Sequence, residues 1–170
     1  MSPSSITAPR WLSVSLTFFI WLVMIPLAHG VLPWGISTLA PRYGWRGVPG
    51  SWNRLGLLLV AAAAALLIWI LVFAIGQIPG RARLGLTPSS LMMRGPYGFS
   101  RNPMYVAELG LWLGWSLYFG SFAVLAGFLI LLSVVRLIIL PREERGLEAA
   151  FGEVYREYKR KVPRWLLSNS

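Results

Sequence analysis

The sequence predicts an all-α integral membrane protein with about four transmembrane helices and a C-terminal amphipathic helix in the cytosol. Three observations predict this fold class. Apolar residues make up 56% of the 170 residues and charged residues only 13%, and the mean hydropathy is +0.61, which lies outside the range of ordinary soluble domains. Long apolar runs recur along the chain. The basic residues gather at one end of these runs.

Four apolar runs locate the expected crossings. Residues 57–75 are uninterrupted and, at about 1.5 Å per residue, long enough to cross a hydrocarbon layer of about 30 Å. Residues 11–32 form an earlier run, which we expect to be an uncleaved anchor, because it is longer than the apolar part of a signal peptide. Residues 104–119 and 122–140 are joined by a bend too short for anything but an antiparallel hairpin.

The connections between the runs have their own signals. Residues 33–52 are rich in Trp, Pro and Gly, which is typical of an interfacial connection with room for a short re-entrant or surface helix. Residues 77–93 contain turn-forming Pro-Gly and Thr-Pro-Ser-Ser segments and predict a cytosolic loop. Alanines at residues 61–65 predict a face where another helix packs closely, and they also permit a homodimer.

The distribution of basic residues predicts the orientation. A formal net charge of +10 would suit a nucleic-acid-binding protein, but the charges follow the positive-inside rule instead. We expect both termini in the cytosol, a location in the bacterial inner membrane next to anionic lipid headgroups, and no nucleic-acid partner. The basic residues expected on the cytosolic side are Arg10, Arg81, Arg83, Arg94, Arg101, Arg142, Arg145, Arg156, Lys159, Arg160, Lys161 and Arg164, and those expected opposite are Arg42, Arg46 and Arg54.

The residue inventory excludes several kinds of site. The chain has no Cys and one His, His29, so a thiolate metal site or a typical zinc site is not available. Asp is absent as well, which excludes Ser-His-Asp chemistry. We expect no metal cofactor.

The segment after residue 140 predicts an amphipathic cytosolic helix. Pro141 suits its first turn, and Glu143 and Glu144 lie where the N-terminus of a helix favours negative charge. Apolar residues recur at spacings of three to four on one face: Leu147, Ala150, Phe151, Val154, Tyr155, Tyr158 and Val162.

Two charged residues lie within the apolar limits of the predicted hairpin. Equal rise from its bend places Arg136 level with Tyr105, and Glu108 about one turn deeper. Charged residues inside spans pair with each other, face the bundle interior or serve a ligand. We therefore expect a pair between Arg136 and Glu108, with a snorkelling Arg136 as the alternative. Arg136 also precedes Glu143 by seven residues, about two turns, which predicts one shared side if the helix continues through Pro141.

A motif loop at residues 95–105, G-P-Y-G-F-S-R-N-P-M-Y, precedes the hairpin. Its Gly-Pro-Tyr turn exposes backbone amides, Arg101 supplies a planar cation, and Asn102 begins a second turn that leads to Tyr105. The rings of Tyr97 and Tyr105, near carboxylates, suit a cationic ligand such as a sulfonium or ammonium group. The alternative is an interfacial aromatic belt. No G-x-G-x-x-G follows a strand, so a soluble-type nucleotide fold is not predicted.

The motif loop and the tail together resemble the isoprenylcysteine carboxyl methyltransferase family, whose relatives include bacterial membrane methyltransferases and phospholipid N-methyltransferases. The resemblance covers about residues 92–165. The family pattern is similar to G-P-Y-x-x-x-R-(H/N)-P-x-Y, a helical hairpin, then E-E-x-x-L-x-x-x-F-G-x-x-Y-x-x-Y and V-P-R. The matching residues are Gly95, Pro96, Tyr97, Arg101, Asn102, Pro103, Tyr105, Glu143, Glu144, Leu147, Phe151, Gly152, Tyr155, Tyr158, Val162, Pro163 and Arg164.

The resemblance implies a membrane enzyme that binds S-adenosylmethionine in a cytosol-facing pocket between the motif loop and the tail. It implies a lipidic or lipid-attached acceptor that enters from the bilayer. Residues 1–93 would then be a transmembrane scaffold and residues 94–170 the methyltransferase core. Glu144, with Glu143 beside it, would hold the ammonium end of the cofactor. The residues implied to line the cofactor site are Pro96, Tyr97, Arg101, Asn102, Pro103 and Tyr105.

Two positions depart from the family pattern, and they limit the chemistry expected. Asn102 stands where many members have His, so a titrating base is absent there, and Ala107 stands at a position that is often Gly. In-line methyl transfer needs positioning and desolvation more than proton removal. Arg136 or Arg101 would fix an acceptor carboxylate, and Glu108 is the candidate base if the acceptor is an amine.

Two other classes of protein remain open. Membrane reductases of the sterol and steroid type resemble this region through an R-H-P-N-Y-x-G-E segment and use NADPH, but Met104 and Ala107 depart from it and the tail fits the methyltransferases better. A non-enzymatic membrane partner would explain the spans, but it leaves Arg136, Glu108 and the aromatic loop without a purpose.

Overall fold

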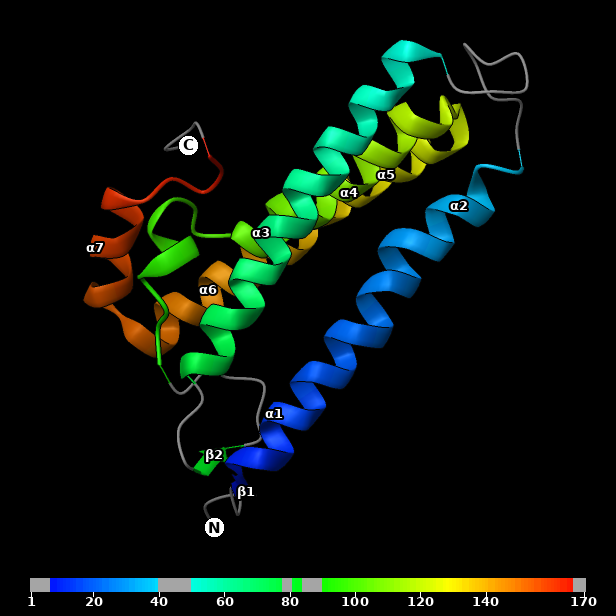
Figure 1. Ribbon diagram of the computed structural model, residues 1–170. Helices are drawn as coiled ribbons and strands as arrows, with labels where there is room; N and C mark the ends of the chain where they lie inside the picture. Colours follow the sequence, from blue (N-terminus) through cyan, green and yellow to red (C-terminus); the bar gives the residue numbers. More distant parts are fainter. Residues whose placement is uncertain (1–6, 40–49, 78–80, 84–89, 167–170) are drawn as a thin grey trace.

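The computed structural model describes residues 7–39, 50–77, 81–83 and 90–166 (Figure 1). Nearly all of the described chain is helical, and the predicted all-α membrane fold is confirmed. The elements in chain order are β1 (Thr7–Pro9), α1 (Arg10–Phe19), the π-helical turns η1 (Ile20–Met24) and η2 (Leu27–Val31), α2 (Leu32–Ile36), η3 (Ser51–Arg54), α3 (Leu55–Gln77), β2 (Arg81–Arg83), η4 (Gly95–Gly98), α4 (Pro103–Phe119), α5 (Phe122–Val134), η5 (Val135–Ile139), α6 (Leu140–Phe151) and α7 (Glu153–Lys161).

Three helices among the described residues are long and apolar enough to cross a membrane: Trp11–Ile36, Leu55–Gln77 and Phe122–Phe151. The remaining predicted crossing corresponds to α4, which has 17 residues. That length rises about 26 Å, the short end of the range for spanning helices. The multi-pass fold is thus established, and the fourth crossing stays a prediction.

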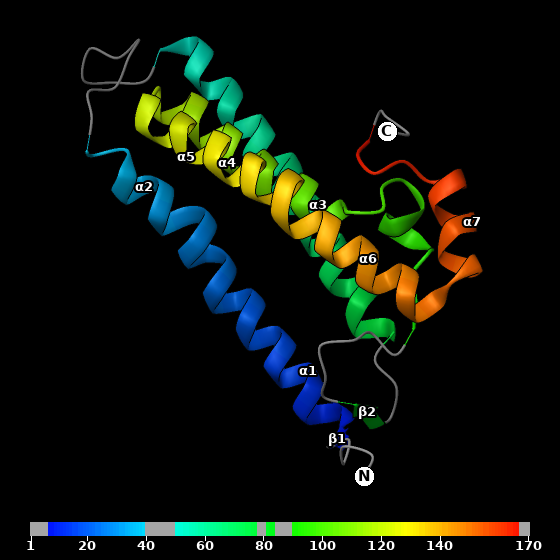
Figure 2. The same ribbon diagram turned by 180° about the vertical axis from the view of Figure 1, so that it is seen from behind.

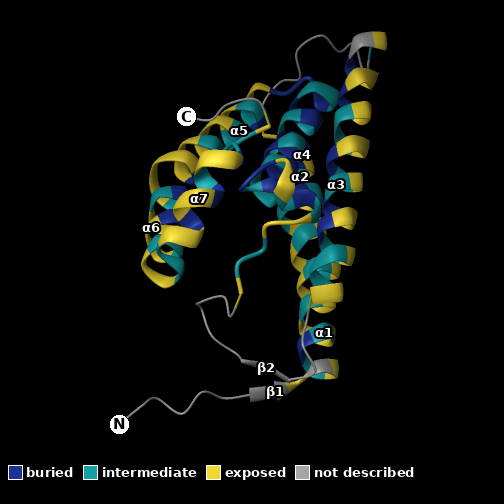
Figure 3. Ribbon diagram, turned by 90° about the vertical axis from the view of Figure 1, so that its left-hand side faces the viewer, coloured by how far each residue is buried: buried dark blue, intermediate teal, exposed yellow. Residues whose placement is uncertain are grey.

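The core of the bundle is the contact between α3 and α4. A Cβ on Gly56 would lie 2.4 Å from the carbonyl oxygen of Gly114. A Cβ on Gly110 would lie 3.1 Å from the Cβ of Ala63. Only small residues permit two helix backbones to approach so closely. The close packing predicted for residues 61–65 is confirmed, with α4 as the neighbour. Figure 3 shows that α4 is largely buried while α3 exposes its outer face.

The predicted hairpin is confirmed. α4 ends at Phe119 and is followed by Gly120, whose φ of 54° is left-handed. The Ser121 side chain caps α5 by accepting from the Val124 N–H. Glycine adopts the left-handed region without steric cost, and the serine satisfies one orphan amide of the next helix.

The cytosolic helix predicted to start at Pro141 differs in the structure. One helix runs without interruption from Phe122 to Phe151, and Pro141 lies inside this helix. The π turn η5 comes just before Pro141, and in this turn the Leu140 N–H donates to the Val135 carbonyl. The amphipathic segment then breaks at Gly152, where φ is +53°. α7 folds back, so that a cluster of apolar and aromatic side chains holds it against α6 and the segment before η4: Leu91, Leu147, Phe151, Tyr155, Tyr158 and Val162.

The first helix lies at the edge of the bundle. Figures 1 and 2 show it running alongside the other helices, with α1 at the end where β1 and β2 lie and α2 at the opposite end. Strand β1 pairs antiparallel with β2, so the start of α1 lies at the same end as the end of α3. The motif loop, α6 and α7 lie at this end too (Figure 1). The predicted connection at residues 33–52 contains α2 and η3, but residues 40–49 lie outside the described ranges, as do 78–80 and 84–89 of the loop at 77–93.

Candidate functional site

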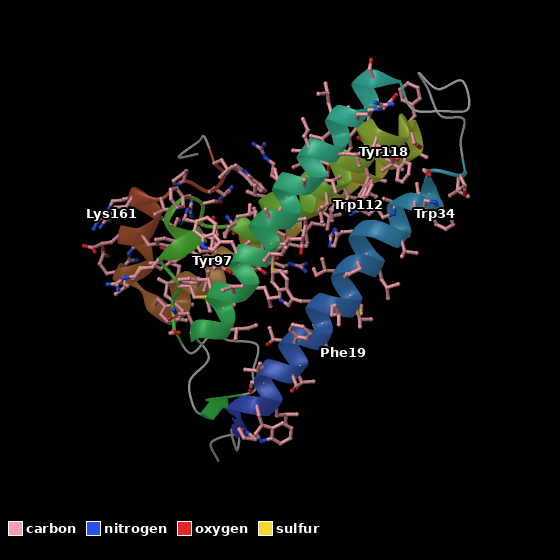
Figure 4. The ribbon with its side chains drawn as sticks, in the orientation of Figure 1. Phe19, Trp34, Tyr97, Trp112, Tyr118 and Lys161 are labelled. Atoms are coloured by element: carbon pink, nitrogen blue, oxygen red, sulfur yellow. The ribbon has the colours of Figure 1, made fainter. Side chains whose placement is uncertain are left out.

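The motif loop packs against the C-terminal part of α3. Gly95 has a φ of +62°, and a Cβ there would lie 2.6 Å from the ring of Phe73, so glycine is required for both conformation and space. Pro96 occupies the first turn of η4 and is buried. The Tyr97 ring lies 6.4 Å from that of Phe73, where the loop meets α3 (Figure 4).

The Val-Pro-Arg end of the tail is bonded to the loop through the backbone. The Arg101 N–H donates to the Pro163 carbonyl over 2.9 Å. The Arg164 carbonyl accepts from the Ser100 hydroxyl at 3.0 Å and from the Asn102 side-chain amide at 3.1 Å. Two segments more than 60 positions apart are thereby fixed together. The resemblance places Asn102 beside the cofactor, but in the structure its side-chain amide donates to the Arg164 carbonyl.

A buried cluster of charges joins the loop to α6. One Glu144 carboxylate oxygen accepts from Arg101 at 2.9 Å and from the Nε of Arg164 at 3.0 Å, and the other accepts from Arg164 at 2.7 Å. The Arg101 and Glu144 side chains are only 5% and 9% exposed. The hydrogen bond to Glu144 raises the pKa of the Arg164 guanidinium, so the charged form of Arg164 is favoured. The buried Nε of Arg101 has no hydrogen-bond partner among the described residues.

A second link places an exposed carboxylate beside the start of α4. The Tyr105 hydroxyl at the start of α4 donates to Glu143 over 2.8 Å, and Glu143 itself is exposed. The Tyr158 hydroxyl of α7 donates to the Tyr97 carbonyl over 2.6 Å. Burial raises the pKa of both Tyr97 and Tyr158, and the nearby Glu143 adds to the effect at Tyr97. The structure thus brings Tyr105, Glu143 and Glu144 to one end of the bundle.

The predicted ion pair between Arg136 and Glu108 does not form, and this expectation was wrong. Arg136 is exposed, whereas Glu108 is buried. The reason is η5: a π-helical turn contains more residues than an α-helical one, so the seven positions from Arg136 to Glu143 no longer amount to two turns. Arg136 is exposed on the helix, and its snorkelling to the headgroups stays a prediction.

Glu108 faces the first helix instead. Its Oε1 lies 3.9 Å from the Nε2 of His29. The Trp112 indole N–H donates to the Nδ1 of His29 over 3.1 Å, and the Trp115 indole N–H donates to the His29 carbonyl over 2.7 Å. Figure 4 shows Trp112 on α4 facing α2. These bonds join the first helix to α4.

Sequence reasoning left several of these residues out of the candidate site, and three of them are Arg164, His29 and Ser100. Arg164 stood in the V-P-R pattern, so its pairing with a carboxylate was detectable as part of the motif. His29 was a lone polar residue in an apolar run, a signal of function or of pairing within a membrane span. Ser100 carried no signal beyond its place in the motif loop.

Comparison with known proteins gives a consistent assignment. A sequence model of the phospholipid methyltransferase family matches residues 52–154, more than half of the chain. The match extends through α3, further toward the N-terminus than the motif resemblance. No solved structure matches the chain.

Two curated proteins are similar to the chain. An uncharacterized protein of Haemophilus influenzae is 41% identical over 63 residues, which cover 37% of this chain and 100% of the relative. The cobalt-zinc-cadmium resistance protein CzcN of Cupriavidus metallidurans is 29% identical over 170 residues, which cover 96% of this chain and 73% of the relative. On the family match, with the converging motif loop and tail, this chain belongs to the phospholipid methyltransferase family and is a multi-pass membrane methyltransferase.

Proposed function

We propose that the chain transfers a methyl group from S-adenosylmethionine to a lipidic or lipid-attached acceptor in the inner membrane, with its motif segments in the cytosol. The observation that carries the proposal is the contact of Tyr105 with Glu143, next to the buried cluster around Glu144. This arrangement brings aromatic hydroxyls, carboxylates and arginines from the motif loop and the tail to one end of the bundle.

The side chains present fit the cofactor. Glu143 is exposed and, with the rings of Tyr97 and Tyr105, suits the ammonium and sulfonium groups of S-adenosylmethionine. The buried Nε–H of Arg101 lacks a partner, so an oxygen of the ligand would satisfy it. We assign the ammonium contact first to Glu143, because Glu144 is already bonded to two arginines. When bound, the cofactor supplies a methyl group activated on a sulfonium sulfur.

The geometry bears on the class of acceptor. Carboxyl methylation, implied by the resemblance, requires a cation that orients the acceptor carboxylate. Arg136 is exposed and has no ion pair with Glu108, and Arg101 is paired with Glu144. An amine acceptor requires a carboxylate base instead, and Glu108 lies one turn from Tyr105 on α4. The geometry therefore favours the phospholipid N-methyltransferase type of reaction over carboxyl methylation.

The name of the Cupriavidus relative concerns metal resistance, and we transfer no metal chemistry from it. No three His, Cys, Asp or Glu side chains of the described ranges lie together as a metal site. The proposal contains no metal step.

Ligand-induced stabilisation tests the cofactor. S-adenosylhomocysteine at about 100 times its Kd is expected to stabilise the detergent-solubilised protein by about 2.7 kcal/mol, which corresponds to about 5–10 °C in Tm. NADPH is expected to leave the Tm unchanged. Stabilisation by NADPH and not by S-adenosylhomocysteine would favour the membrane reductase instead.

A matched pair of variants locates the site. Glu143→Gln is expected to remove most of the stabilisation by S-adenosylhomocysteine, because a neutral amide attracts the ammonium group weakly. Glu157→Gln makes the same chemical change on an exposed face of α7 and is expected to keep the full shift. Equal shifts in the two variants would place the cofactor elsewhere.

A further inference from the structure

Glu108 is a buried carboxylate with unused hydrogen-bonding capacity. It is 8% exposed, and in the described part of the chain no group donates a hydrogen bond to it. Its Oε1 lies 3.9 Å from the Nε2 of His29, which is too long for a direct hydrogen bond. A buried polar group without a partner is costly, and natural structures satisfy such groups by water or a ligand.

His29 presents a fixed donor toward the same place. Because the Trp112 N–H donates to Nδ1, Nδ1 must carry a lone pair, and the proton of the neutral imidazole lies on Nε2. A doubly protonated ring would set two N–H groups against each other. His29 is therefore held neutral, with its Nε2–H directed toward the Glu108 carboxylate across the gap.

The gap lies beside a large apolar cavity. A cavity of about 980 Å³ separates the first helix from α3 and α4, and His29 forms part of its wall. The spacing of Glu108, Leu111 and Trp115 places them on one face of α4, and the latter two line the cavity. The rest of the wall includes Trp21, Ile25, Val60 and Leu67. The volume and apolar wall suit a hydrocarbon chain.

We infer that His29 and Glu108 form the headgroup site of the methyl acceptor, and that this site selects an amine or hydroxyl headgroup on a lipid whose chain occupies the apolar cavity. This inference rests on the proposed function. An uncharged amine or a hydroxyl both accepts and donates hydrogen bonds, so one such group satisfies the His29 N–H and the Glu108 carboxylate together. An ionised carboxylate would face Glu108 with a like charge, and Glu143 lies near enough to interact electrostatically with Glu108.

The step assigned to this pair is a proton transfer. The N–H or O–H bond of the acceptor breaks, its electron pair stays on the heteroatom, and the proton forms an O–H bond on Glu108. The heteroatom gains a bond to the methyl carbon, and the carbon–sulfur electron pair stays on the sulfur of the sulfonium donor. His29 carries no proton away; it orients the headgroup. Among the described residues, Tyr105 on α4 and Glu143 on α6 also lie near enough to interact electrostatically with Glu108.

Three lipids with one chain and different headgroups test the selection. Purified protein in detergent is given radiolabelled S-adenosylmethionine and either oleylamine, oleyl alcohol or oleic acid, and label transfer and Tm are measured. We expect transfer to the amine or the alcohol and none to the acid. Glu108→Gln is expected to lower kcat by about 100-fold or more, and His29→Phe to raise KM, while both retain stabilisation by S-adenosylhomocysteine.

Three outcomes overturn the inference, and one of them depends on a binding measurement. Methylation of oleic acid would do so, as would an unchanged kcat in Glu108→Gln. If none of the three lipids is methylated, the inference survives only if oleylamine or oleyl alcohol stabilises the protein in a manner that Glu108→Gln abolishes. If S-adenosylhomocysteine fails to stabilise the unmodified protein, the proposed function fails first, and the two failures are thereby distinguished.

Discussion

Removal of the Glu144 carboxylate should destabilise the protein strongly. Glu144→Ala leaves two arginines without their anion. Arg101 is 5% exposed and cannot recover its hydration, whereas Arg164 is 26% exposed and can do so in part. The loss of one partner from a buried ion pair costs about 3–5 kcal/mol, nearly all of it from Arg101. For a chain of this size that corresponds to about 6–20 °C in Tm.

The assay is thermal unfolding in detergent, without ligand. Glu153→Ala is the matched control, because Glu153 also contacts two arginines, Arg156 and Arg160, but on an exposed face, where ion pairs contribute little. We expect no measurable change in Tm for that variant. Adding Arg101→Met to Glu144→Ala removes the unpaired charge and is expected to restore part of the loss.

Two results would refute this reasoning. One is a Glu144→Ala variant that unfolds at the temperature of the Glu153→Ala variant. The other is a double variant with Arg101→Met that is no more stable than Glu144→Ala alone. Either would mean that the cluster is hydrated and does not hold the motif loop to α6, so Glu144 would be free for the cofactor as the resemblance implies.

Three further perturbations test the packing and the loop. Gly114→Ala should lower the Tm clearly, because its Cβ would lie 2.7 Å from Val60, whereas Gly146→Ala has nothing within 4 Å and should not. Gly152→Ala should cost about 1–2 kcal/mol, because φ is +53° there; an unchanged Tm would mean that the break between α6 and α7 relaxes. Burial raises the pKa of Tyr158, so stability is present below about pH 10 and falls as the pH rises above it, because the unfolded side chain ionises first. Tyr158→Phe should reduce that fall, and the same slope in the variant and the unmodified protein would contradict the assignment.

Much of the fold follows from composition and pattern. Apolar runs longer than a bilayer is thick must become helices, because a backbone in hydrocarbon has to satisfy its own hydrogen bonds. The short bend at Gly120 then requires a hairpin. The meeting of the motif loop with the tail was predictable as well, since both flank that hairpin at the same end.

Local helix geometry escaped prediction from pattern. The π turn at Val135–Ile139 changes the angular position of Arg136, and nothing in the local sequence signals an extra residue in a turn. The break at Gly152 could not be predicted either, because an isolated glycine in a helical pattern is often tolerated. The break at Gly152 accompanies the packing of α7 back onto α6 and Leu91.

The sequence by itself determined the membrane class, the hairpin and the family, because hydropathy, charge asymmetry and motif spacing are properties of the chain in order. Only the tertiary structure decided which charges meet. Glu144 binds Arg101 and Arg164. Glu108 faces His29, which lies on a helix more than 70 positions earlier in the chain. Which residues pair in a buried site depends on their angular positions around the helix and on which helix lies beside them. The residue spacing along one segment does not give this information.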